Sequence, residues 1–316
     1  MSDASTDHVA PTASIPAAEL VELQRRSDAR GLVRLAGHLV AIAGAGALYA
    51  LSLERASWPF QLAAAFAFGF TLVTMFATMH ESVHRTAFKS RWLNDAVAWG
   101  AGLLSFYNST FYRPYHGWHH RYTQLTGQDP ELEDPKPTGL GSYLLELSGL
   151  PWWLGKLRTH FGIAFGKTHS YGFLNDATTP GVVRSVRWQL AVYGAGIALS
   201  FALGRPYFVT YWLVPVALAQ PALRALLLAE HTVCSQDSDP LANTRTTHTL
   251  FPVRFLMWEM PYHAEHHHFP ALPFFALASV HQKLEPRLKH VARHGYSGFH
   301  AALLKSFSGR TSEAAP

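Results

Sequence analysis

The chain has 316 residues, of which 48% are hydrophobic and only 15% are charged, whereas soluble domains have roughly 25% charged residues. The formal net charge is +5, but the basic residues lie beside apolar runs and not on a stripe, which favours a membrane surface over nucleic acid as the partner. The single cysteine, Cys234, excludes an internal disulfide, an iron–sulfur cluster and a cysteine-rich zinc site.

The first 29 residues are rich in Ala, Ser, Thr, Pro and Asp. They lack the basic start and short apolar core of a cleaved signal peptide. We predict a flexible N-terminal tail at 1–29, one membrane domain with a histidine-rich cap at 30–295, and a C-terminal tail at 296–316.

Four apolar stretches predict two transmembrane hairpins. The first pair covers 35–53 and 58–79, and the second covers 188–204 and 207–223. A bilayer core of about 30 Å requires roughly 20 apolar residues per helix, so the second pair is slightly short.

A fifth uncharged stretch at 96–112 decides the topology. If it crossed the bilayer, the histidine groups before and after it would lie about 30 Å apart, so we expect it to lie in the interface or to re-enter. Only Arg55 and Arg205 fall in the turns on the far side. The positive-inside rule then places both termini and the histidine groups in the cytoplasm. The predicted fold is an all-α integral membrane protein with about four transmembrane helices in two hairpins, interfacial helices and a cytoplasmic histidine-rich cap.

The 19 histidines include three clusters, which read HESVH at 80–84, HGWHH at 116–120 and HAEHH at 263–267. On a helix, positions i, i+3 and i+4 share one face, so each cluster can direct its imidazoles at one point. The candidate metal ligands are His80, His84, His116, His119, His120, His263, His266 and His267. A four-coordinate zinc site cannot use eight ligands, which favours two ions. We add His231 as a ninth candidate, because it follows the last apolar stretch on the histidine side.

The remaining histidines have less specific signals. His38 stands alone in an apolar stretch and is expected to be a packing residue or an interface anchor. His268 points about 100° away from His267 on a helix, so its expected role is packing or a hydrogen bond to a residue that contacts a ligand. We expect surface or loop positions for His8, His160, His169, His248, His281, His290, His294 and His300.

Two other kinds of metal protein are compatible with the first cluster. HESVH matches the H-E-x-x-H signature of zinc proteases, in which His80 and His84 would bind zinc and Glu81 would be the general base. That alternative leaves the other two clusters unexplained. A metal carrier or sensor would need ionisable groups along a path across the bilayer, and the apolar stretches hold almost none.

Over roughly residues 30–290 the chain resembles the membrane fatty acid desaturase superfamily, which includes hydroxylases and carotenoid ketolases. HESVH resembles the first histidine box of that family, and HGWHH with the following RYTQLTGQDPEL resembles the second box and its acidic loop. PYHAEHHHFPALP at 261–273 resembles the third box. The paired transmembrane hairpins of the family, with every box on the cytosolic side, agree with the predicted topology.

The resemblance implies a di-iron centre that uses O2 as co-substrate and removes hydrogen from an unactivated C–H bond. It implies the same eight histidines as ligands, and His231 matches an additional histidine of acyl-CoA members. Leu227 stands where those members have an asparagine. The expected reaction is O2-dependent desaturation of a fatty acyl or lipid-like chain. Hydroxylation or ketolation of a lipid, a carotenoid or a specialised metabolite is the alternative, since ligand spacing does not separate these reactions.

Carboxylates near such ligands orient the imidazole rings. The candidates are Glu81, Glu230 and Glu265 within the motifs, and Asp129 and Asp134 after the second box. Trp118 and Tyr262 are candidates for the substrate channel, although interfacial aromatics also serve as anchors. We expect no catalytic side chain beyond the metal ligands.

The reaction needs two electrons per turnover. The sequence shows no fused haem domain, no cysteine-ligated cluster and no Gly-rich dinucleotide fingerprint. We therefore expect a separate electron donor, such as a ferredoxin or a cytochrome with its reductase. A basic cytoplasmic face would suit an acidic donor.

Overall fold

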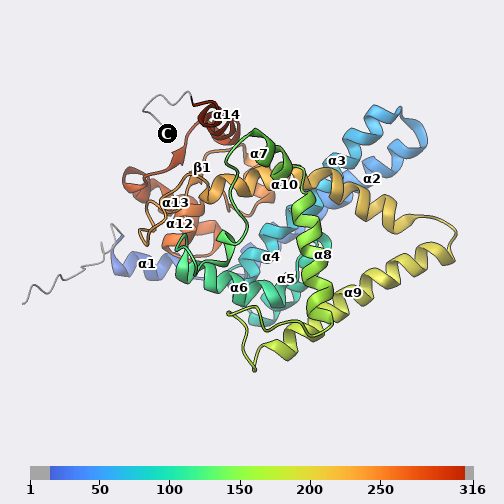
Figure 1. Ribbon diagram of the computed structural model, residues 1–316, viewed down its shortest axis with the longest axis horizontal. Coiled ribbons are helices and arrows are strands. Elements are labelled where there is room, and N and C mark those ends of the chain that lie inside the picture. The colour runs from blue at the N-terminus through green and yellow to red at the C-terminus, as the bar shows by residue number, and fades with distance from the viewer. Residues whose placement is uncertain (1–14, 310–316) are drawn as a thin grey trace, which may run out of the picture.

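Helices make up most of the chain in the computed structural model, which describes residues 15–309 (Figure 1). The first half contains α1 (Ala17–Leu23), α2 (Asp28–Arg55), α3 (Trp58–Val73), α4 (Met75–Val83), α5 (Arg91–Ser105), α6 (Ser109–Tyr122), the 3-10 turn η1 (Pro130–Leu132), α7 (Leu140–Leu147) and α8 (Leu150–Ala164). The second half contains α9 (Thr179–Ala202), the π-helical turn η2 (Val209–Leu213), α10 (Val214–His231), β1 (Thr246–Thr247), α11 (Phe251–Leu256), α12 (His263–His268), α13 (Phe274–Leu284), the 3-10 turn η3 (Glu285–Arg287), β2 (Val291–Ala292) and α14 (Gly295–Phe307).

Three helical segments within the described residues are long and apolar enough to cross a membrane: Asp28–Arg55, Trp58–Val83 and Val209–His231. The first two form the predicted N-terminal hairpin, and the third is the second arm of the predicted C-terminal hairpin. The first arm of that hairpin, α9, has 24 residues but does not meet the same criteria. A membrane protein is therefore supported, and the count of four spans stays a prediction.

The two hairpins point the same way. In Figure 1 the turn between α2 and α3 and the turn between α9 and α10 both extend to the right, away from α12 and α13. The charged residues of these turns, Arg55 and Arg205, therefore lie at the far end from the helices that carry the third histidine cluster.

Helices α3 and α4 are separated at a single residue, Thr74. Its hydroxyl donates to the carbonyl of Phe70 at 2.7 Å, and such back-bonding bends helices. His38 lies against this bend, with Nε2 2.9 Å from the carbonyl oxygen of Thr71, and its Nδ1 accepts from the Trp258 indole at 3.3 Å. Both ring nitrogens are satisfied and the side chain is buried, as expected of a packing residue.

The close approach of α3 and α10 depends on Gly69. A Cβ at this position would lie 1.9 Å from the carbonyl oxygen of Pro215, so only glycine permits this helix spacing. The π-helical turn η2 immediately precedes Pro215, which lacks the N–H that an α-helical turn would use. The contact brings the end of α10 towards the end of α4.

The uncharged stretch at 96–112 does not form one helix. Helix α5 ends at Ser105, and Phe106 adopts a left-handed conformation with φ 61°. Helix α6 then begins at Ser109, and its N-terminus is capped by the Asn108 side chain, which accepts from the Phe111 N–H at 3.0 Å. The break agrees with a segment that does not cross the bilayer.

Parts of both predicted tails are helical. Residues 1–14 and 310–316 lie outside the described range, but α1 and the start of α2 fall within the predicted tail at 1–29, and α14 falls within the one at 296–316. Ile15 is buried in a cluster with Leu277 and Leu284 of α13. Helix α14 buries Phe299 against the end of α10. Short apolar segments that pack on distant elements give little local signal in the sequence, and the domain boundaries stay a prediction.

Candidate metal centre

The three histidine clusters lie on three different helices. His80 is on α4 and His84 caps its end, the second cluster is on α6, and the third forms most of α12. His231 is the last residue of α10. All nine predicted ligands converge on one region, and seven of them are buried.

Five of the imidazoles form the first group, which consists of His80, His84, His116, His120 and His266. One nitrogen of each lies within 4.8 Å of the corresponding nitrogen of every other. The Nε2 atom of His120 is 3.0 Å from Nε2 of His116 and 3.1 Å from Nε2 of His266. These ring nitrogens therefore point at a shared space and not at protein acceptors.

The second group consists of His119, His231 and His267, and His263 lies beside it, with its Nε2 3.2 Å from Nε2 of His231. In each of the first three rings the Nδ1 atom has a protein partner. These partners are Asp129 Oδ1 at 2.9 Å for His119, the Asn243 carbonyl at 3.1 Å for His231 and the Thr123 hydroxyl at 3.2 Å for His267. This arrangement leaves Nε2 to face the centre.

Many nitrogens of these rings have no hydrogen-bond partner although they are buried. They are Nε2 of His80, His84, His119 and His267, and Nδ1 of His120 and His263. Buried polar atoms are normally hydrogen-bonded, so this concentration of unpaired nitrogens is what a metal site would present without its ions. The donor set fits metals that accept imidazole, which include Zn, Cu, Fe and Ni.

Burial keeps most of the rings neutral. The pKa values of His116, His120 and His266 lie well below the ordinary value because of desolvation and the neighbouring histidines. A metal ligand must be the neutral imidazole. These three rings therefore have the protonation state that metal binding requires, whereas at His119 burial is outweighed by Glu131 and Asp129, which raise the pKa of that ring.

Asp129 fixes the orientation of His119. Burial raises the pKa of Asp129, but the hydrogen bond and charge of His119 outweigh it, so the net shift is downward. The carboxylate also accepts from the backbone N–H groups of Gln124 and Glu131 at 2.7 and 2.9 Å. The loop after the second cluster is thereby held against α6, and the carboxylate lies where it can orient the His119 ring.

The other predicted carboxylates have different roles. Glu230 lies at the centre, with Oε2 3.5 Å from Nε2 of His263. Glu265 points away from it and accepts from the Thr246 hydroxyl and from Nδ1 of His281. Glu81 accepts the backbone N–H of Phe274 at 3.0 Å, so it fixes the start of α13 and contacts no ligand ring.

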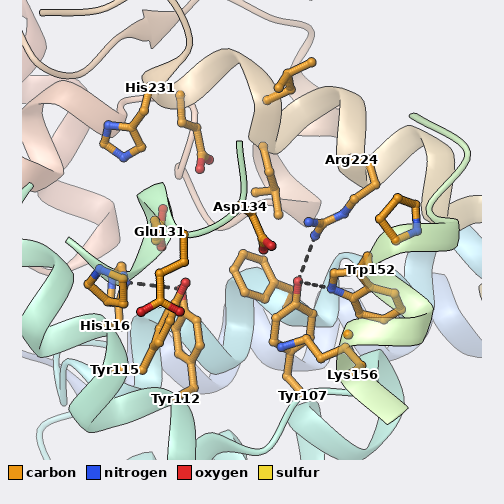
Figure 2. Close-up of a pocket in the computed structure, with 18 of the residues that line it drawn as sticks. Tyr107, Tyr112, Tyr115, His116, Glu131, Asp134, Trp152, Lys156, Arg224 and His231 are labelled. Atoms are coloured by element: carbon orange, nitrogen blue, oxygen red, sulfur yellow. Dashed lines mark hydrogen bonds between the residues drawn. The ribbon is translucent and has the colours of Figure 1, made fainter. Parts of the chain in front are cut away.

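The residues around the centre enclose a cavity of about 340 Å³. Its lining includes His80, His116, His231 and His263 at one end, and the side chains shown in Figure 2 continue it towards Trp152 and Arg224. Asp134 lines this cavity, as do several aromatic residues of α6. The cavity gives a substrate access to the group of imidazoles.

Neither predicted channel residue lines this cavity. Trp118 donates from its indole to the Gln128 carbonyl at 3.1 Å and packs on Tyr122. The Tyr262 hydroxyl accepts from Arg254 at 3.1 Å, and its ring packs on His281. Both side chains therefore contact other residues outside this cavity, and their role in a substrate channel stays a prediction.

Sequence reasoning missed several residues that contact the ligand rings. Glu131 Oε2 lies 3.7 Å from Nε2 of His119, and the Tyr112 hydroxyl lies 3.3 Å from Nδ1 of His116. Tyr112 precedes His116 by one helical turn, so helix periodicity contained a signal for it. His160 and His281, predicted at the surface, are buried; His160 stacks on Phe106 and His281 bonds Glu265.

Comparisons with known proteins agree with this arrangement. The family model described as fatty acid desaturase matches residues 56–298. The sn-1 oleoyl-lipid 12-desaturase of Picosynechococcus sp. is 26% identical over 267 residues, which cover 78% of this chain and 75% of that protein. The enzyme of the same name from Synechocystis sp. is 24% identical over 69% of this chain and 66% of its own length. The beta-carotene 4-ketolase of Protosiphon botryoides is 30% identical over 106 residues, covering 32% of this chain and 27% of that protein.

Proposed function

The chain belongs to the fatty acid desaturase family, and from that premise we propose that it catalyses O2-dependent desaturation of a fatty acyl or lipid-like chain at a histidine-ligated di-iron centre. The observation that carries the proposal is the convergence of nine imidazoles, four of which line one end of a cavity, with several buried ring nitrogens that have no hydrogen-bond partner. Family membership implies iron. The number of irons, their use of O2 and the substrate are parts of the proposal.

The side chains divide into ligands and residues that hold them. When bound, the iron pair would supply the O2 chemistry that removes hydrogen from an unactivated C–H bond. The two groups of imidazoles would hold one ion each, with His263 and Glu230 beside the second group. Asp129, Thr123 and the Asn243 carbonyl fix the Nδ1 atoms of the second group. The rings are therefore oriented before any metal binds, which favours a defined geometry.

Ketolation or hydroxylation is the second candidate, because one of the similar proteins is a beta-carotene 4-ketolase.

The zinc protease alternative loses support from the geometry. Its general base would be Glu81, which is bonded to the Phe274 backbone and does not line the cavity. Its zinc ligands, His80 and His84, lie among imidazoles of the other clusters.

Topology and electron supply complete the proposal. We place four spans in the membrane, with α9 as the fourth, and both termini and the metal centre in the cytoplasm. In this topology only Arg55 and Arg205 fall in the two turns on the far side, which supports the cytoplasmic placement by the positive-inside rule. A separate ferredoxin or cytochrome with its reductase would supply the two electrons.

Metal analysis of the detergent-purified protein tests the centre. Protein grown in 57Fe medium should contain about two irons per chain with the Mössbauer spectrum of a coupled pair. His119→Ala and His266→Ala, one from each group, should each lower the iron content, whereas His169→Ala at an exposed position should not. One zinc per chain that survives both changes and is lost with His80→Ala would instead indicate the protease.

Product analysis tests the reaction. Membranes that contain the protein and a reductase system would be incubated with oleoyl lipids, free acids or beta-carotene, with and without O2. A new double bond that requires O2 supports desaturation, and a keto or hydroxy product supports the second candidate. Oxidation of a polar metabolite alone would contradict a lipid substrate.

A further inference from the structure

Two basic side chains, Arg224 and Lys156, contact Tyr107 at the end of the cavity that lies away from the imidazoles (Figure 2). The Arg224 guanidinium and the Trp152 indole both donate to the Tyr107 hydroxyl, at 2.8 and 3.0 Å. The Lys156 ammonium lies over the face of the same ring, 3.9 Å from its centroid. These four residues come from α8, α10 and the break between α5 and α6.

Neither cation has an acidic partner. Among residues 15–309, no carboxylate oxygen lies within ion-pair distance of Lys156 or Arg224, and Nε of Arg224 is buried without a hydrogen-bond partner. Burial, with the charge of Arg224 as the next cause, lowers the pKa of Lys156 to about 7. Both side chains are partly buried, and charges withdrawn from water are normally paired, so within the described residues this pair lacks a direct counter-ion.

The acids of the cavity occupy other positions. Glu131 and Glu230 lie at the metal end, within 3.7 and 3.5 Å of ligand rings. Asp134 lies between the two ends, with its carboxylate directed towards the Tyr107 hydroxyl (Figure 2). Glu133, Lys136 and Glu146 also line the cavity. The negative charge at the centre matches bound cations, whereas Asp134 and Glu131 act on Lys156 only through longer-range attraction.

The Tyr107 hydroxyl adds a further donor. It accepts two hydrogen bonds, from Arg224 and Trp152, and these occupy its two lone pairs. Its own proton is left to donate to a third group. An oxyanion in contact with Tyr107, Arg224 and Lys156 would receive neutral and charge-assisted hydrogen bonds together, and charge-assisted bonds are the stronger type.

We propose that Arg224, Lys156 and Tyr107 bind the acidic end of the substrate, which is an oxyanion such as the carboxylate of a free acid or the phosphate of a lipid headgroup. The inference rests on the proposed function, because it assigns one end of the same substrate. The hydrocarbon chain then runs along the aromatic wall of the cavity, formed by Phe76, Phe111, Tyr112 and Tyr115. A C–H bond part-way along the chain thereby reaches the imidazoles.

The position of Arg224 supports a binding role. It lies in the third candidate spanning segment, Val209–His231, where an ionisable residue is costly unless it has a partner or a function. It precedes His231 by two helical turns, so both residues lie on the same side of α10 and both line the cavity. The spacing fixes the distance between the acidic end and the reacting centre.

Binding measurements on the full-length protein in a neutral detergent test the proposal without turnover. Oleate is compared with methyl oleate, and dioleoylphosphatidylglycerol with dioleoylglycerol, by isothermal titration calorimetry. We expect at least one charged probe to bind about 10-fold or more tightly than its neutral counterpart, as a charge-assisted contact predicts. The preferred charged probe identifies a carboxylate or a phosphate. Equal affinities within both pairs would overturn the proposal.

Variants test whether Arg224 and Lys156 cause the tighter binding of the charged probe. Arg224→Gln and Lys156→Gln should each weaken binding of the charged probe about 10-fold and leave methyl oleate unchanged, whereas Arg158→Gln at an exposed position of α8 should change neither. Arg224→Lys keeps the charge and should retain most of the preference, even if Arg224→Gln does not fold. A charge preference that survives both glutamine variants would place the oxyanion elsewhere and overturn the assignment.

The two proposals can fail separately. Selective binding of an acid that is abolished by these variants, without oxidation of any acid under conditions of iron loading and reduction, would support the binding site and contradict the desaturase reaction. O2-dependent oxidation of only neutral lipids, with no charge preference in binding, would support the reaction and overturn the binding site.

Discussion

Asp129 accepts a hydrogen bond from Nδ1 of His119 at 2.9 Å, and the opposite nitrogen of the same ring has no protein hydrogen-bond partner and faces the centre. Asp129 therefore helps to orient a ligand ring, although it does not contact the nitrogen of that ring that faces the centre. Its two further bonds to backbone N–H groups of the following loop make the pair rigid.

Asp129→Asn tests this relationship. The amide can present its N–H to Nδ1 and favour the wrong tautomer, so we expect iron affinity to fall about 10- to 100-fold, the usual effect of removing such a partner. Iron competition with a chelator measures the change. Asp176→Asn, at an exposed loop position, is the control. Unchanged affinity in Asp129→Asn would show that the hydrogen bond does not orient the ligand.

Lys156 makes stability depend on pH. Its pKa is lowered from 10.5 to about 7 in the folded chain, first by burial and then by Arg224, so between these values the unfolded chain binds more protons and stability rises with pH. Lys156→Met removes this dependence. We expect the variant to have a higher Tm than the parent at pH 7, with the difference shrinking towards pH 10, in thermal unfolding in detergent. Lys167→Met, at an exposed position, should show no such trend, and equal curves for both variants would contradict the burial of the ammonium.

Gly69 sets the spacing of α3 and α10. A methyl group there would meet the Pro215 carbonyl at 1.9 Å, and overpacking of this kind costs about 1–3 kcal/mol. We therefore expect Gly69→Ala to lower the Tm measured in detergent. At Gly44 a Cβ would meet no atom within 4 Å, so Gly44→Ala should be neutral or stabilising, because alanine favours helix. Equal Tm values for the two variants would mean that the helices can separate freely.

Glu81 distinguishes a structural carboxylate from a general base. Glu81→Gln keeps an oxygen for the Phe274 N–H, so lipid oxidation and iron content should stay within about threefold of the parent, consistent with the small net value of one hydrogen bond. Glu81→Ala leaves that buried N–H unpaired and should lower the Tm. Complete loss of activity in the glutamine variant, with iron content intact, would indicate a chemical role for this carboxylate.

The ligand rings could be predicted from sequence because i, i+3, i+4 spacing places them on one helical face. Trp118 could have been rejected by the same rule, since it follows His116 by two residues and lies on another side of α6. Thr123 was not predictable, because its contact with His267 joins segments far apart in the chain. The Asn243 carbonyl that contacts His231 was not predictable, because a backbone carbonyl has no residue-type signal. The orientation of the Glu265 side chain away from the centre was not predictable either, because its partners Thr246 and His281 come near it only in the folded chain.

Thr246 belongs to two arrangements at once. Its backbone N–H donates to the His290 carbonyl at 3.1 Å beside the pairing of β1 with β2, and its hydroxyl donates to Glu265 within the third cluster. The segment that contains His290 and β2 therefore holds a residue that contacts the third cluster, although it supplies no ligand. A protein truncated at residue 289 would keep every histidine of the three clusters and lose both the His290 carbonyl and β2, so a shortened version can be metal-poor without any change in its ligands.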